Sequence, residues 1–236
     1  MVSRTALVTG GSSGIGLAIA SSLAADGYAL TITGRSEGKL AAAVESLPGA
    51  DVHAVAGDLS LPGQAEAVVA AHRSRFGSLD VLVANAGGSR RATVAETEPE
   101  AVRRLLAVHV EAAFALTRAA LPLLRRPPDE RPGWVIVTSS IAARYPVAGF
   151  AAYAAAKAAL ATLARSVNAE EAAHGVRACA LCPAFVSTPL TAPIPIADML
   201  HPDDVAAGVR FLLSLSPAAV VSELVIERAG AGPAQP

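Results

Sequence analysis

The sequence predicts an α/β protein in which helices cover both faces of a parallel, doubly wound sheet of about seven strands. Three observations predict it. Short apolar segments alternate with longer amphipathic ones, the short segments are apolar on both faces, and a glycine-rich turn follows the first of them. Strict alternation of strands and helices makes neighbouring strands parallel. Strands that are apolar on both faces need helices on each side of the sheet.

Seven short apolar segments are the predicted strands: Thr5–Thr9, Ala29–Thr33, Val52–Ala56, Val81–Ala84, Val135–Ser139, Arg177–Leu181 and Leu224–Glu227. Six longer segments between them are the predicted helices: Ile15–Ala25, Lys39–Leu47, Gln64–Arg75, Pro99–Leu124, Ala151–Ala173 and Pro202–Leu215. Sheets of this type bind ligands beyond the carboxyl ends of their strands. We therefore expect the functional residues in the loops that follow the strands.

One domain over residues 1–236 is expected, because the chain shows no internal repeat and no linker between two cores. Its one proline-rich stretch, 127–132, is too short to separate independent cores. Within this domain we expect a short lid at about residues 187–200 and a mobile tail at about residues 229–236.

Charge and hydropathy exclude several classes of protein. The net charge of −1 comes from scattered charges, without the clustered basic surface of a nucleic-acid-binding protein. No uninterrupted run of apolar residues is long enough to span a membrane. The first residues lack the length and cleavage features of a signal peptide. A soluble, cytoplasmic protein is expected.

Two cysteines, Cys179 and Cys182, form a CxxC pattern that can indicate redox or metal chemistry. The alternative, which we favour, is a buried strand. Residues three apart on a strand point to opposite faces, and no second cysteine pair completes a metal site. We expect no metal.

The first predicted strand runs into the segment TGGSSGIG, residues 9–16, and a helix follows. Glycines permit a tight turn with positive φ and a close approach of the backbone to a diphosphate. The free N–H groups at the start of the following helix attract phosphate oxygens. A Rossmann-type dinucleotide site is therefore expected, although a plain glycine-rich turn is the alternative. Its predicted contacts are Gly10, Ser12, Ser13, Gly14, Ile15 and Gly16.

The end of the second predicted strand favours NADP(H) over NAD(H). A dinucleotide fold that prefers NAD places an acidic residue there to bind the ribose 2′-hydroxyl. This chain has Arg35 instead, and a guanidinium can grip a 2′-phosphate that a carboxylate would repel. Ser12, Ser13 or Ser36 would assist it. The alternative is a solvated arginine after a strand.

Asp58 follows the third predicted strand. Its carboxylate can cap a turn, or it can accept a hydrogen bond from an adenine amino group. The residues alone leave both interpretations open.

Three residues form the predicted catalytic set. Ser140 follows the fifth strand, and Tyr153 and Lys157 lie four apart, on one face of the next helix. A nearby cation is expected to lower the pKa of the tyrosine, which can then exchange a proton with a substrate oxygen while hydride moves at carbon. Ser140 would polarise that oxygen. The alternative for the pair alone is a surface lysine beside an unrelated aromatic ring.

Together these segments resemble the short-chain dehydrogenase/reductase family over nearly the whole chain. The matching segments, in order, are TGGSSGIG at 9–16, Asp58–Leu59, Asn85–Gly87, Ser140 with YxxxK at 153–157, and Pro183–Thr188. The resemblance implies that Asn85, Ala86 and Gly87 support the adenosine side of the cofactor and that Asp58 and Leu59 border the adenine. It also implies that the segment from Pro183, with Val186 and Thr188, meets the nicotinamide end beside Tyr153 and Lys157.

The chain departs from the family pattern at three places. His109 stands where the family usually has an asparagine whose backbone carbonyl anchors a water in a proton relay through the lysine. The resemblance thus places His109 in the catalytic machinery with an altered relay, and the alternative is a histidine that only packs or caps. Ala184 replaces the usual glycine after the proline, and the familiar glycine-rich ending of the last strand is missing.

The substrate pocket is expected in the loops after the fourth to sixth strands. Its predicted residues are Ser140, Ile141, Tyr145, Tyr153, Phe185 and Leu190. Most are apolar or small, which suits a hydrophobic carbonyl compound; Arg90 and Arg91 suggest an acidic substrate or, as we favour, a solvated loop. Alanine-rich helices allow close packing, and the resemblance implies a homodimer or homotetramer formed through them.

The sequence therefore predicts an NADP(H)-dependent oxidoreductase that moves a hydride between the nicotinamide and a carbonyl or alcohol. Two alternatives remain open at this point. The same hydride and proton donors serve imine or double-bond reduction, and a non-catalytic NADP-binding regulator would share the fold.

Overall fold

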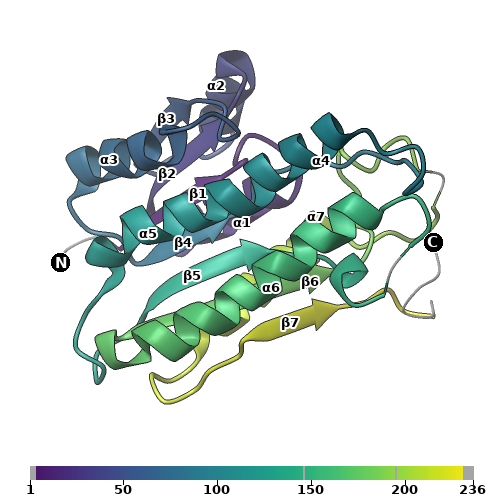
Figure 1. Cartoon of the computed structure of the whole chain (residues 1–236). Helices are drawn as coiled ribbons and strands as arrows, with labels where there is room; N and C mark the ends of the chain where they lie inside the picture. Colours follow the sequence, from purple (N-terminus) through teal and green to yellow (C-terminus); the bar gives the residue numbers. More distant parts are fainter. Residues whose placement is uncertain (1–3, 146, 195, 231–236) are drawn as a thin grey trace.

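A seven-stranded parallel sheet runs through the protein in the order β3-β2-β1-β4-β5-β6-β7 (Figure 1). The computed structural model describes residues 4–145, 147–194 and 196–230, so most of the predicted tail lies outside the described residues. The strands are β1 (Thr5–Thr9), β2 (Ala29–Gly34), β3 (Val52–Ala56), β4 (Val81–Ala84), β5 (Gly133–Thr138), β6 (Val176–Pro183) and β7 (Glu223–Ile226). After β3 the chain returns to place β4 beside β1, and this reversal of strand order creates a crevice at the carboxyl edge. The predicted fold class is confirmed.

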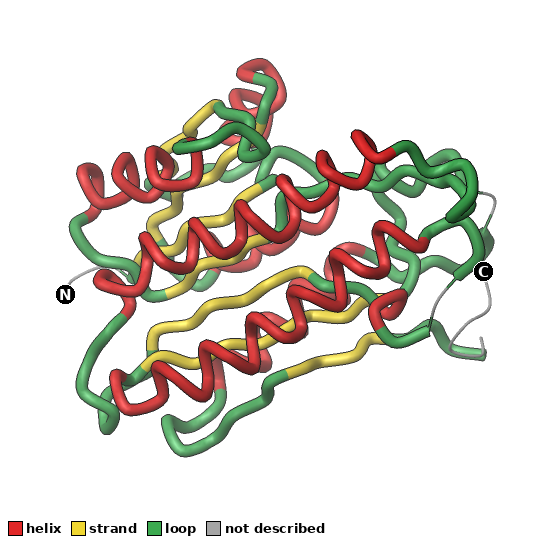
Figure 2. The backbone as a smooth tube through the Cα atoms, viewed as in Figure 1, coloured by secondary structure: helices red, strands yellow, loops and turns green. Residues whose placement is uncertain are grey.

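Helices cover both faces of the sheet (Figures 1 and 2). They are α1 (Gly14–Ala25), α2 (Glu37–Glu45), α3 (Gln64–Phe76), α4 (Pro99–Leu106), α5 (Ala112–Leu124), α6 (Ala151–Glu171) and α7 (Pro202–Ser214). One apolar core joins α3, α5 and α6 to the sheet, and a second core joins α1, α2 and α7 to its other face. This two-sided burial explains why the inner strands read as continuous apolar runs.

The predicted helix Pro99–Leu124 is wrong as a single regular element. Helix α4 ends at Leu106, a π-helical turn spans Ala107–Glu111, and α5 continues from Ala112. No proline or glycine marks the break in the sequence. The widened turn carries His109, whose ring forms a hydrogen bond with the backbone of Gly88, in the loop after β4. Turns of this kind are frequent at functional sites.

The two edge strands correct a second expectation, that all strands are apolar on both faces. Every residue of β7 is only partly buried, and β3 consists of three partly buried and two exposed residues. Each edge strand has one neighbouring strand rather than two, so less of it is covered.

Cys179 and Cys182 are buried, unpaired residues of β6 that face the two different cores. Burial raises the pKa of both thiols to about 12, so neither is a thiolate at neutral pH. Among the described residues no cluster of three histidine, cysteine or acidic side chains is suited to hold a metal ion. The interpretation as a buried strand is confirmed.

One helical stretch within the described residues, Pro99–Leu124, has the length and mean hydropathy of a membrane span. Its residues Ala112, Ala113 and Leu116 belong to the core on one face of the sheet. Core helices of soluble proteins pass the same test of length and composition, so this is weak evidence for a membrane span.

Candidate active site

The glycine turn after β1 forms a cradle in which three positions, Gly10, Gly14 and Gly16, carry no side chain. Gly10 and Gly14 have positive φ values of 65° and 54°, and a Cβ atom on Gly16 would overlap the carbonyl oxygen of Gly10. Helix α1 begins here; the Ser13 side chain makes no capping hydrogen bond and no acidic residue lies in the first turn. The N–H groups at this helix end are therefore available to bind an anion such as a phosphate.

Asn85 locks the end of β4 to this turn. Its Nδ2 donates to the Thr9 carbonyl oxygen over 3.0 Å, and the Asn85 and Ala86 amides donate to Thr9 Oγ1 over 2.9 and 3.0 Å. The same Nδ2 would lie 2.6 Å from a Cβ atom on Gly16. Asn85 thus holds the glycine turn in place from the side.

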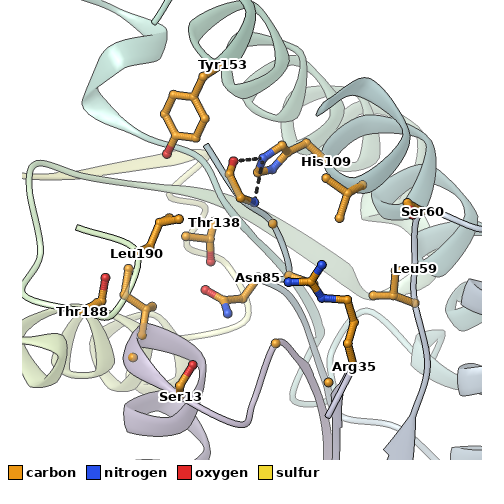
Figure 3. Close-up of a pocket in the computed structure, with 18 of the residues that line it drawn as sticks. Ser13, Arg35, Leu59, Ser60, Asn85, His109, Thr138, Tyr153, Thr188 and Leu190 are labelled. Atoms are coloured by element: carbon orange, nitrogen blue, oxygen red, sulfur yellow. Dashed lines mark hydrogen bonds between the residues drawn. The ribbon is translucent and has the colours of Figure 1, made fainter. Parts of the chain in front are cut away.

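A cleft of about 830 Å³ extends over the carboxyl ends of the inner strands (Figure 3). It joins the glycine turn and the end of β2 to the ends of β5 and β6. Pockets for cofactors commonly have this size. The bare cradle, the open N–H groups and the orphaned buried His109 Nδ1 and Thr138 Oγ1 atoms fit a dinucleotide laid across the sheet.

Arg35 lines one side of the cleft, opposite Tyr153 (Figure 3). Nearby, Asp58 Oδ1 accepts hydrogen bonds from the Ser60 amide and hydroxyl over 3.0 and 2.7 Å. These two bonds lower the pKa of Asp58 below its usual value. Asp58 therefore does cap a turn, and this turn leaves both Asp58 and Leu59 on the cleft wall.

Two hydrogen bonds tie the end of β5 to α6. Ser139 Oγ donates to the Lys157 carbonyl oxygen over 2.8 Å, and Lys157 Nζ donates to the Thr138 carbonyl oxygen over 2.6 Å. Lys157 Nζ lies 5.4 Å from the centroid of the Tyr153 ring, and the Ser140 side chain is near enough to Tyr153 to affect its pKa. The structure thus brings the predicted catalytic set of Ser140, Tyr153 and Lys157 together.

The side chains of the protein do not bring the pKa of Tyr153 below its ordinary value, contrary to the expectation from sequence. Burial raises the pKa of Tyr153 to about 12, although the hydrogen bond from Ser140 opposes this. Burial also lowers the pKa of Lys157 to about 7, so the ammonium is only partly charged at neutral pH. Desolvation therefore outweighs the effect of the lysine, and Tyr153 is a protonated phenol.

His109 lies beside Tyr153. Its Nε2 is 2.7 Å from the Gly88 carbonyl oxygen, and its ring meets Tyr153 edge-on, with centroids 5.7 Å apart and an interplanar angle of 84° (Figure 3). The side chain is 3% exposed and belongs to the cleft wall. It is therefore part of the site and not a surface histidine.

Most of the predicted site residues share the cleft wall. These are Gly10, Ser12, Ser13, Gly14, Ile15, Arg35, Asp58, Leu59, Asn85, Ala86, Gly87, His109, Ser140, Tyr153, Lys157, Pro183, Val186, Thr188 and Leu190.

Five predicted residues lie off the wall. Gly16 packs inside the glycine turn. The Ser36 hydroxyl accepts a hydrogen bond from the Lys39 amide and so caps α2. Ile141 is buried in the 3-10 turn after Ser140, which carries the next residues away from the cleft. Tyr145 and Phe185 are also outside it.

Sequence reasoning missed several wall residues, including Arg103, Arg104, Gly88 and Thr138. Arg103 and Arg104 lie on α4 and pair with Glu100 at its surface. Charged residues at helical spacing are ordinary on an exposed helix, so no local signal distinguishes them.

Gly16→Ala should destabilise the protein and weaken dinucleotide binding, because the new Cβ atom must displace the Gly10 carbonyl or Asn85. Overpacking of this kind costs about 1–3 kcal/mol. Denaturant unfolding and NADPH fluorescence titration measure both effects. Gly38→Ala is the matched control: it lies on α2 with no atom within 4 Å of the added methyl, and we expect unchanged binding.

Lys157→Met should stabilise the protein at pH 7 by about 1–3 kcal/mol, because the wild type buries an amine whose charged form is disfavoured. The folded pKa of about 7 lies below the ordinary 10.5, so the unfolded chain binds more protons between these values. Wild-type stability therefore rises with pH across this window, and the advantage of the variant shrinks.

Urea unfolding at pH 7 and at about pH 9.5 tests this difference. The control is Lys39→Met, which changes an exposed lysine of α2 and should leave stability nearly unchanged at both pH values. Equal stability of wild type and Lys157→Met at pH 7 would contradict the prediction.

Comparison with known proteins places the chain in a family. Residues 4–198 match the model of the short chain dehydrogenase family. The chain is 31% identical to a putative ketoacyl reductase of the granaticin polyketide synthase of Streptomyces violaceoruber, over 96% of this chain and 92% of the relative. It therefore belongs to the short-chain dehydrogenase/reductase family.

Solved structures agree. An alcohol dehydrogenase from Thermococcus sibiricus, solved with 5-hydroxy-NADP, matches with a TM-score of 0.88 and 30% identity, covering 98% of this chain and 99% of that one. A 3-ketoacyl-(acyl-carrier-protein) reductase from Brucella melitensis, solved with NADH, matches with a TM-score of 0.86 and 28% identity, covering 95% and 96%. The two neighbours thus share the fold but were solved with different nicotinamide dinucleotides.

Proposed function

We propose that this protein is an oxidoreductase that transfers a hydride between NADP(H) and a carbonyl or alcohol substrate. The observation that carries the proposal is the convergence of Ser140, Tyr153 and Lys157 beside a glycine cradle at one edge of the sheet. The named relatives support it, because they are reductases and dehydrogenases.

Each member of the set has a separate task. Bound NADPH supplies the hydride. Tyr153, a protonated phenol at neutral pH, donates its proton to the substrate oxygen in the reductive direction and takes it back in the oxidative one. Ser140 holds that oxygen through its hydroxyl, and Lys157 places a positive charge near the phenol as the proton leaves.

Arg35 supports NADP(H) as the preferred dinucleotide. The cleft wall at the end of β2 carries this guanidinium and no carboxylate on the same strand end. Ser12 lies against Gly34, so its hydroxyl faces the same region. A 2′-phosphate placed there meets one strong donor, the Arg35 guanidinium, whose positive charge also acts on the nearby Asp58 carboxylate.

The experiment is NADPH oxidation against a panel of ketones, aldehydes, quinones and imines, with NADH as the control. We expect turnover with at least one carbonyl class and a clear preference for NADPH. Turnover of imines alone would move the proposal to imine reduction. Comparable efficiency with NADH would contradict the role of Arg35.

The proposal includes a single catalytic domain, a cytoplasmic location, and a homodimer or homotetramer. Phe114 of α5 is 52% exposed, and an apolar ring at a helix surface supports assembly through that helix. The proposal also includes a lid at about residues 187–200. Two contacts at its ends support it: a parallel β-bridge joins Val186 to Leu200, and Thr188 lies against Gly14 of the cradle.

A further inference from the structure

His109 has one nitrogen that the site uses and one that it leaves open. Nε2 lies 2.7 Å from the Gly88 carbonyl oxygen, and a carbonyl oxygen only accepts. The proton of the neutral ring is therefore on Nε2. The Gly88 amide, 3.3 Å from the same nitrogen, has no lone pair there to bond to.

The ring is neutral at physiological pH. Burial, and then the positive charge of Lys157, lowers the pKa of His109 to about 3, against a weaker opposing effect of the Gly88 carbonyl. The ionisable side chains known to face the ring, Lys157 and Tyr153, both come from α6. With the proton on Nε2, Nδ1 is a bare acceptor.

This acceptor is buried and has no hydrogen-bond partner within the described part of the chain. A buried acceptor without a donor costs about 1–3 kcal/mol, so a donor is expected there. The backbone of Gly87 lies against the ring: a Cβ atom on that residue would stand 2.7 Å from Nδ1. Only glycine leaves the ring, and a small donor beside it, in place.

Lys157 is a second hydrogen-bond partner that such a donor could have. Lys157 carries two N–H donors as a neutral amine and three as an ammonium, and one of them goes to the Thr138 carbonyl oxygen. The charge of Lys157 acts on the His109 ring, so the two side chains lie near one another. An O–H group in contact with both would donate to Nδ1 and accept from Lys157 at the same time. The Tyr153 ring, in edge contact with His109, borders the same space.

We propose that His109 is a positioning residue: its Nε2–H holds Gly88, its ring supports Tyr153, and its Nδ1 accepts a hydrogen bond from an O–H donor shared with Lys157. This role concerns the same site as the proposed function, and its effect on catalysis depends on that function. It assigns the task to the side chain, whereas the family resemblance assigned one only to the backbone carbonyl at this position. The donor is a water molecule or a hydroxyl of the bound dinucleotide, and these two sources share one chemistry.

The direct test is NMR of the wild-type protein labelled with 15N-histidine, with and without NADPH. His109→Asn identifies the resonances among the five histidines. We expect a protonated Nε2, an unprotonated Nδ1 and no titration between about pH 5 and pH 8. A hydrogen-bond shift of Nδ1 without NADPH identifies water as the donor, and a shift only with NADPH identifies a dinucleotide hydroxyl.

Three outcomes would overturn the proposal: a protonated Nδ1, a ring that titrates near its ordinary pKa, or an Nδ1 resonance that shows no hydrogen bond under either condition. This test needs no turnover. If the wild type reduces no compound of the panel, the proposed function fails while the tautomer result stands by itself.

The kinetic test uses His109→Phe, which keeps a ring against Tyr153 and removes both nitrogens. We expect kcat to fall about tenfold and its pH profile to shift, with KM for NADPH little changed. The control is His72→Phe, which removes a buried histidine bonded to Thr31 and Ser78 outside the cleft. A purely structural role would lower the stability of both variants and shift neither pH profile.

Discussion

Tyr153→Phe is expected to lower kcat by about 100- to 10,000-fold, the range that a general acid usually contributes. The variant removes one oxygen atom and keeps the ring that packs against His109 and Phe150. It also removes the hydroxyl whose pKa the Ser140 side chain affects. Steady-state NADPH oxidation measures the loss, and fluorescence titration should show NADPH binding close to that of the wild type.

The control for this change is Tyr28→Phe. Tyr28 is a buried tyrosine just before β2, at the opposite end of the sheet, and its hydroxyl accepts from Arg4. We expect a small loss of stability and unchanged turnover. A Tyr153→Phe enzyme with wild-type kcat would refute the assigned proton donor, whatever the cofactor affinity.

Arg35→Asp is expected to reverse the cofactor preference. The guanidinium that we propose binds the 2′-phosphate becomes a carboxylate, which would repel that phosphate and accept a hydrogen bond from a ribose hydroxyl instead. A hydrogen bond to a charged group contributes about 1.5–3 kcal/mol, so kcat/KM for NADPH should fall at least tenfold. The same parameter for NADH should fall much less or rise.

The ratio of the two kcat/KM values is the measurement. Arg73→Asp supplies the control, because it makes the same charge change on an exposed residue of α3 outside the cleft. An unchanged ratio in Arg35→Asp would show that the 2′-phosphate is recognised elsewhere on the wall, where Arg103 and Arg104 also stand.

Local patterns in the sequence were sufficient to predict the fold, the glycine turn and the pairing of Tyr153 with Lys157. Apolar runs buried on both faces predicted the inner strands, because burial between two helix layers removes any polar face. The spacing of Tyr153 and Lys157 placed both on one face of α6, since residues four apart on a helix are neighbours. The glycines of the cradle indicated a turn that side chains would fill.

Contacts between residues distant in the chain decided the rest. The tautomer of His109, on the π-helical turn Ala107–Glu111, depends on Gly88, which lies twenty-one positions earlier in the chain. The pKa values of Tyr153 and Lys157 follow from burial, which a helical spacing does not reveal. Whether Tyr145 or Arg104 reaches the cleft depends on where a turn or a helix points its side chains. Sequence periodicity fixes which residues share an element, but hydrogen bonding and desolvation across elements appear only when the chain is folded.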